Sequence, residues 1–144
     1  MTRVAISAVL MLLLPGWTQP SDNILRFVES TTAETAEGIA DQQADKEMHV
    51  GRALVEQGNR VGALNRFKTV VTRFQTSWHV EEALARLAQI YLALDIPTEA
   101  QTVVAVLVRK FPNGRWSAEA HDALKAAGYE PADNEFSWMS RAVK

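Results

Sequence analysis

The sequence predicts an all-α protein, a short α-solenoid of helical hairpin repeats that follows an N-terminal signal segment. Two stretches, Gly51–Gln75 and Ala88–Pro112, can be laid over each other without a gap. Ala63 in the first stretch lies 37 residues before its counterpart Ala100 in the second. A fixed period of this length is typical of arrays in which each helical pair buries its apolar face on its neighbour. Within both stretches the apolar residues recur at helical spacing.

Length and composition limit the class of protein. The chain has 144 residues, enough for one domain, and a formal net charge of −2. A nucleic-acid-binding domain would carry a basic excess, so we expect no nucleic acid partner. There is no cysteine, which excludes disulfides, thiolate metal sites and a cysteine nucleophile.

Residues 1–20 have the features of an export signal. Arg3 precedes an apolar run, Val4–Leu14, that is too short to span a membrane, because a spanning helix needs about 20 residues. A buried first helix of the fold is the alternative. Leu14-Pro15-Gly16-Trp17 resembles a bacterial lipoprotein box with Trp17 in place of the lipidated cysteine. A chance match in a leucine-rich run is the alternative. We therefore expect a cleaved periplasmic protein or one tethered by an uncleaved signal.

Residues 21–44 form a polar entry and a lead-in helix. Thr31 followed by Glu34 fits a capping box, which predicts a helix start at Thr31. The repeats then occupy residues 45–129. Gly58 stands where a helix end needs a left-handed residue.

The second helix of the first hairpin is expected from about Arg60 to Phe74. Its buried stripe consists of Val61, Leu64, Phe67, Val70, Val71 and Phe74. The basic residues on its other faces are Arg60, Arg66, Lys68 and Arg73. They form either a solvated surface or a docking face for an acidic partner.

The second hairpin repeats this plan. Ser77 is the expected N-cap of its first helix, and Asp95 stands 37 residues after Gly58 at the left-handed position. Pro97 fits the first turn of the next helix. A further helix over Trp116–Ala127 is predicted to be the first half of a third, incomplete repeat.

The C-terminal tail, residues 130–144, contains three large apolar side chains, Phe136, Trp138 and Met139. We expect them to pack back onto the last helix, with a partner-binding segment as the alternative.

The repeats resemble tetratricopeptide repeats. The matching residues are Gly51, Ala63 and Phe67 in the first repeat and Ala88, Tyr91, Ala100 and Pro112 in the second. Leu54 and Gln75 depart from the pattern. The stretch from Asp45 to Gln101 resembles more closely the alphaproteobacterial family of the outer membrane protein assembly factor BamD. The pieces that carry the resemblance are Lys46-Glu47-Met48, Ala63-Leu64-Asn65-Arg66-Phe67, His79-Val80-Glu81-Glu82-Ala83-Leu84 and, in the tail, Ser137-Trp138-Met139-Ser140-Arg141-Ala142.

This resemblance implies a non-catalytic protein-binding scaffold of the bacterial cell envelope, at the periplasm or the periplasmic face of the outer membrane. The family is lipidated and has about five repeats, whereas this chain shows about two and a half. The half that the chain resembles is associated with docking to the periplasmic domains of the barrel protein BamA. Membrane association would then come through partners or an uncleaved signal. A periplasmic repeat protein of the Tol or cell-division machinery is the alternative.

Residues with catalytic or metal-binding chemistry do not form a recognisable motif. His49, His79 and His121 make no i, i+4 pair, and Glu119 points to another side of a helix than His121. A carbohydrate- or peptidoglycan-active enzyme would need paired carboxylates in a cleft, and the sequence shows no such pair. We therefore predict no catalytic residue, no metal and no cofactor.

Candidate partner-binding residues follow from the repeat register. In tetratricopeptide arrays the first helix of each pair lines the concave face. This register places Arg52, Glu56, Glu82 and Gln89 there, and the tail adds Phe136 and Trp138 as further candidates.

Overall fold

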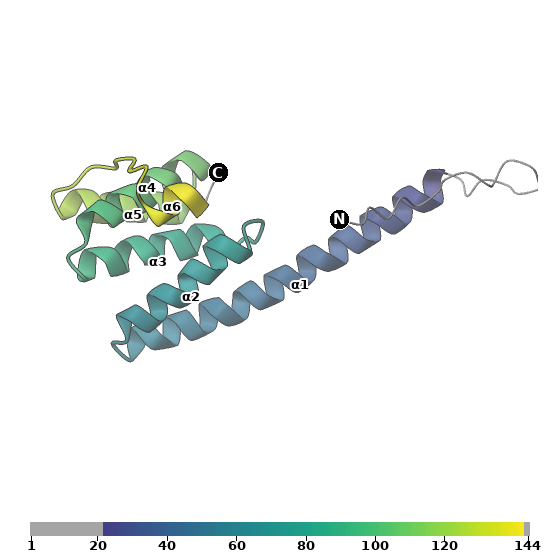
Figure 1. Ribbon diagram of the computed structural model, residues 1–144, viewed down its shortest axis with the longest axis horizontal. Helices are drawn as coiled ribbons and strands as arrows, with labels where there is room; N and C mark the ends of the chain where they lie inside the picture. The colour runs from purple at the N-terminus through teal and green to yellow at the C-terminus, as the bar shows by residue number, and fades with distance from the viewer. Residues whose placement is uncertain (1–21, 143–144) are drawn as a thin grey trace, which may run out of the picture. The chain divides into compact units, whose positions relative to one another are not determined.

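A computed structural model describes residues 22–142 of the chain (Figure 1). The helices are α1 (Asp22–Glu56), α2 (Arg60–Arg73), α3 (Val80–Ala93), α4 (Pro97–Lys110), α5 (Arg115–Ala126) and α6 (Trp138–Ala142). The described part of the chain contains no β-strand, which agrees with the predicted all-α class. The signal-like segment 1–20, Trp17 included, lies outside the described residues.

The chain divides into two units, Met1–Glu34 and Thr35–Lys144. Residues 22–34, the described part of the first unit, are helical. The second unit contains the remainder of α1 and all the later helices. None of the helices over residues 22–142 combines the length and apolar character that a membrane crossing requires.

Helix α1 begins nine residues earlier than the capping box suggested. It starts at Asp22 and contains Thr31 in its interior, so the predicted start at Thr31 is wrong. No glycine or proline lies between the two positions, and nothing in the sequence there interrupts a helix.

The second unit consists of two helical layers. Helix α3 packs against α2, α4 and α5, and α4 packs against α5 and α6 (Figure 1). Side-chain contacts join α1 to α3 and α3 to α5, and we call α1, α3 and α5 the first-helix layer. The largest fully buried side chains of the common core are Met48, Phe67, Leu84, Leu87, Leu107, Leu124 and Met139.

Close packing of α1 on α2 depends on a glycine. A Cβ atom at Gly51 would come within 2.6 Å of Cε1 of the Phe67 ring, which is fully buried. Because two non-bonded carbons need about 3.5 Å, only glycine lets the two helices approach this closely. Both residues belong to the predicted repeat pattern, and the structure shows why they occur together.

The turns between helices confirm most of the predicted turn chemistry. Gly58 and Asp95 adopt left-handed conformations, with φ of 76° and 58°, and Pro97 opens α4. Ser77 is not the N-cap of α3, because α3 begins at Val80 with His79 at the cap position. Ser77 instead begins a tight turn, in which its carbonyl oxygen accepts a hydrogen bond from the Val80 amide at 3.1 Å.

The C-terminal tail packs onto α4 and α3, so the predicted packing onto the last helix is wrong. Met139 is fully buried, and the indole Nε1 of Trp138 donates a hydrogen bond to Oη of Tyr91 at 2.7 Å. The Nζ atom of Lys68 on α2 lies 4.2 Å from the centre of the Trp138 ring. The tail is directed along α4 because the side-chain amide of Gln101 donates to the Glu130 carbonyl at 2.8 Å.

Candidate protein-binding site

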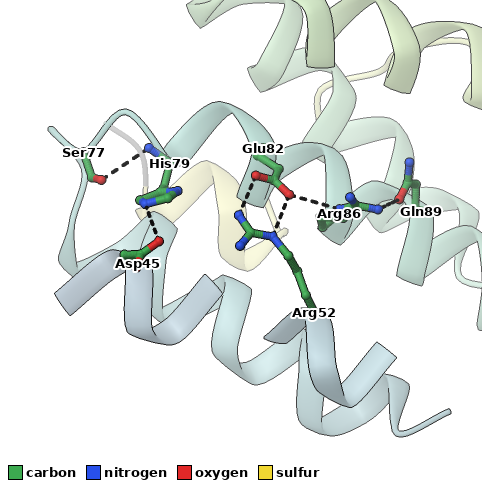
Figure 2. Close-up of polar contacts among 7 residues, drawn as sticks. All are labelled: Asp45, Arg52, Ser77, His79, Glu82, Arg86 and Gln89. Atoms are coloured by element: carbon green, nitrogen blue, oxygen red, sulfur yellow. Dashed lines mark hydrogen bonds and ion pairs between the residues drawn. The ribbon is translucent and has the colours of Figure 1, made fainter. Parts of the chain in front are cut away.

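An ion pair between α1 and α3 forms the centre of the first-helix layer. Arg52 donates two hydrogen bonds to Glu82, from Nε to Oε1 at 3.0 Å and from Nη2 to Oε2 at 2.8 Å (Figure 2). The Glu82 side chain is only 11 % exposed, whereas that of Arg52 is 37 % exposed. Two parallel charge-assisted hydrogen bonds hold both side chains in a defined geometry.

A second pair repeats this contact between α3 and α5. The side-chain nitrogen of Gln89 donates to Oε1 of Glu119 at 3.4 Å. Gln89 and Glu119 are 30 positions apart in the sequence, as are Arg52 and Glu82. Each member of the second pair lies 37 residues after its counterpart in the first. The polar contacts of the layer therefore follow the same period as the fold. In the second pair the neutral amide of Gln89 takes the place of the Arg52 guanidinium.

Glu82 stays ionised because its cationic partners outweigh its burial. Burial alone would raise the pKa of Glu82, but the hydrogen bonds from Arg52 and the charges of Arg52 and Arg86 bring its pKa below the usual value. The hydrogen bonds to Glu82 also raise the pKa of Arg52. The pair is charged at neutral pH and belongs to the internal structure of the layer.

Arg86 extends the network along α3. Its Nε donates to Oε1 of Glu82 and its Nη1 donates to Oε1 of Gln89, both at 3.4 Å (Figure 2). Its guanidinium carbon lies 5.1 Å from the centre of the Trp116 ring on α5, and this stacking restricts its plane.

A second carboxylate, Glu81, joins α3 to α5. Its Oε1 accepts hydrogen bonds from the backbone amides of Trp116 at 2.9 Å and Ser117 at 3.2 Å. Helix α5 has no capping side chain of its own, because Gly114 occupies its N-cap. A Cβ atom at Gly114 would overlap the Glu81 carboxylate, so this residue leaves room for a cap supplied by another helix.

The predicted partner-binding residues lie in the first-helix layer and in the tail. The first-helix layer brings together Arg52, Glu82 and Gln89, while Glu56 is an exposed residue at the end of α1. Trp138 is half-buried in the tail and contributes to packing. Phe136 is 81 % exposed. The prediction that these residues contact a partner stays a prediction.

Reasoning from the sequence missed Arg86, Glu119 and Glu81. A test for donor–acceptor pairs that recur after 37 residues would have found Gln89 with Glu119. The role of Glu81 has no such signal, because the equivalent position one repeat earlier is Ala44, which cannot cap a helix.

The buried histidine is also part of the α1–α3 contact. His79 is 1 % exposed, and its Nε2 lies 3.3 Å from Oδ1 of Asp45 (Figure 2). The Trp78 ring stacks on it with centroids 3.6 Å apart. Among residues 22–142, no three histidine or carboxylate side chains gather in a way that could hold a metal ion. The polar contacts of the layer join neighbouring helices.

The antiparallel hairpins, the 37-residue period and the recurring contacts between first helices define a helical-repeat protein. Residues 29–105 match the model of the family YfiO, described as outer membrane lipoprotein. The chain belongs to this family.

Curated relatives support the assignment. The chain is 42 % identical over 94 residues to the outer membrane protein assembly factor BamD of Caulobacter vibrioides, covering 65 % of this chain and 31 % of that protein. It is 37 % identical over 87 residues to BamD of Rickettsia prowazekii, covering 60 % and 35 % of the two chains. It is 30 % identical over 95 residues to BamD of Neisseria gonorrhoeae, covering 66 % and 35 %.

These matches confirm the resemblance to BamD that the sequence shows. The chain spans about a third of the length of the curated relatives it matches. No solved structure matches the chain. The relatives are named as assembly factors, and they do not favour the Tol or cell-division alternative.

Proposed function

We propose that this chain is a non-catalytic protein-binding scaffold of the bacterial cell envelope that takes part in outer membrane protein assembly. The observation that carries the proposal is the match of residues 29–105 to the outer membrane lipoprotein family, whose curated relatives are named assembly factors. The proposed partner is a protein, in particular the periplasmic domains of BamA, and the chain needs no cofactor and performs no turnover.

The proposed contact surface is the first-helix layer with Arg52, Glu56, Glu82 and Gln89, together with the exposed Phe136 beside Trp138 in the tail. Charged side chains held in fixed positions favour this use, because a rigid surface loses little conformational entropy on binding. The Arg52–Glu82 pair fixes two of these groups by hydrogen bonds to each other.

The experiment compares how the wild type and a charge-swapped variant bind the proposed partner. We expect the full chain to bind purified periplasmic domains of BamA from the same bacterium in a pull-down and in titration calorimetry. The double variant Arg52→Glu/Glu82→Arg keeps oppositely charged partners on α1 and α3 but exchanges their positions, so that a negative charge takes the more exposed position 52, and should bind more weakly.

A matched control is available outside the first-helix layer. Arg109 on α4 and Asp133 in the tail form an exposed ion pair at 3.1 Å, and the variant Arg109→Glu/Asp133→Arg should bind normally. Lack of binding by the unaltered chain would contradict the assembly function. Equal binding by both double variants would leave the function standing and reject the first-helix layer as the contact surface.

A cell-envelope location is the second part of the proposal. We expect the chain in the periplasmic or outer membrane fraction, with a mature N-terminus whose mass shows whether residues 1–20 have been removed. Recovery of the chain from the cytoplasmic fraction alone would contradict this location.

A further inference from the structure

An open cleft of about 170 Å³ lies where the ends of α1 and α2 meet the second half of α3. Its lining combines aliphatic side chains with two arginines, and consists of Val55, Arg60, Arg86, Gln89, Ile90 and Ala93. Val55 is 39 % exposed, so part of the apolar lining is accessible. The cleft adjoins the Arg52–Glu82 pair, because Arg86 and Gln89 belong both to its wall and to the polar network.

Arg86 is already oriented for recognition. Glu82 and Gln89 hold two edges of its guanidinium, each through a contact of 3.4 Å, and Trp116 restricts its plane. Among the described residues, its Nη2 group has no hydrogen-bond acceptor. A guanidinium presents five N–H donors in a rigid fork that matches a carboxylate, so donors remain for a ligand.

The charge balance of the cleft is positive. None of the six lining residues is a carboxylate, and Glu82, which Arg86 contacts, already receives the two shorter hydrogen bonds from Arg52. Arg60, the first residue of α2, is exposed, and its side chain makes no ion pair with any residue in the described part of the chain. Two guanidinium groups, those of Arg60 and Arg86, thus line a cleft whose accessible apolar surface includes Val55.

We propose that this cleft binds a segment of a protein partner in which a carboxylate side chain stands next to an apolar side chain. The carboxylate lies between Arg60 and Arg86, and the apolar side chain covers Val55 and Ile90. This inference rests on the proposed function, since it names the chemistry that a partner offers to one part of the first-helix layer. Charge complementarity and an accessible apolar floor select this occupant over a basic segment.

The test uses the full chain and defined peptides. Three fluorescein-labelled octapeptides differ only in their central pair, which is Leu-Asp, Leu-Asn or Ser-Asp. We expect the Leu-Asp peptide to bind at concentrations up to about 1 mM and to shift the arginine Nε–H NMR signals of Arg60 and Arg86. The Leu-Asn peptide should bind up to about five-fold more weakly, which is the range for a partly exposed ion pair.

Variants assign the binding to the cleft. Arg60→Gln should weaken the Leu-Asp peptide by about two- to five-fold, and Val55→Thr should reduce its advantage over Ser-Asp. The control is Arg73→Gln, an exposed arginine in the last turn of the same helix as Arg60, which should change nothing. Circular dichroism confirms that each variant is folded.

Two outcomes overturn the inference: no binding of the Leu-Asp peptide, or equal effects of Arg60→Gln and Arg73→Gln. If the peptide fails while the periplasmic domains of BamA bind, the cleft is rejected and the assembly function stands. If the peptide binds as expected and BamA does not, the cleft is confirmed and the proposed partner is wrong.

Discussion

The ion pair between Arg52 and Glu82 allows a quantitative test of how the repeats are joined. We consider the single variants Arg52→Met and Glu82→Gln and the double variant, studied at pH 7. Fully exposed ion pairs contribute about 0.2–1 kcal/mol, whereas truncation of one partner of a buried pair costs about 3–5 kcal/mol. Glu82 is 11 % and Arg52 37 % exposed, so the pair falls between these cases.

Arg52→Met removes two charge-assisted hydrogen bonds, at 3.0 and 2.8 Å, and Glu82→Gln removes the charge of their acceptor, which supports a coupling free energy of about 1–2 kcal/mol. Urea denaturation followed by far-UV circular dichroism gives the free energy of unfolding of each variant, and a double-mutant cycle isolates the pair. In a domain of this size, a loss of about 1 kcal/mol corresponds to a Tm decrease of about 4–8 °C. A coupling free energy below about 0.3 kcal/mol would refute the reasoning.

The same pair predicts a pH dependence with a definite sign. Because the pKa of Glu82 is lowered in the folded protein, its stabilising contribution is fully present above the usual glutamate value of 4.5. That contribution is lost as the pH falls through the lowered folded value. The difference in stability between the wild type and Glu82→Gln should therefore shrink below about pH 4.5. A difference that stays constant down to the acid transition would contradict this assignment.

Three further predictions concern packing, the tail and a turn. Gly51→Ala should destabilise the fold by about 1–3 kcal/mol, because the added Cβ overpacks against Phe67. Gly38→Ala should stabilise the fold by about 0.4–1 kcal/mol, because a Cβ there meets no atom within 4 Å. Urea denaturation measures both. Trp138→Phe removes the hydrogen bond to Tyr91 and should cost about 0.5–1.5 kcal/mol; an unchanged urea midpoint would show that this bond contributes nothing. Asp95→Gly should raise the Tm, because glycine accommodates a φ of 58° without strain; a lower Tm would mean that the Asp95 side chain stabilises the turn.

Much of the fold could be predicted because repetition makes local signals reinforce one another. The 37-residue period, the left-handed positions Gly58 and Asp95, and the small residue Gly51 opposite Phe67 all predict the same hairpins. The helix starts were harder, because Thr31 and Ser77 have capping chemistry that the surrounding chain does not use. A polar residue near a helix start becomes a cap only if the backbone there leaves the helix.

The site was predicted only in part. Register placed Arg52, Glu82 and Gln89 on one helical layer, and the structure confirms that they lie together. It could not show that two of them pair with each other, because that depends on side-chain reach across helices. Trp138 is a candidate because it is a large aromatic residue in the tail, but its indole N–H donates to the Tyr91 hydroxyl group, which a sequence pattern does not reveal.

The cap that Glu81 supplies to α5 has a consequence for the order of folding. The backbone amides at the start of α5 acquire their acceptor only after α3 has formed and lies alongside. An α5 that formed alone would begin with a glycine and fray from its first turn. The third, incomplete repeat is therefore a dependent unit: its amide hydrogens should exchange with solvent whenever α3 opens.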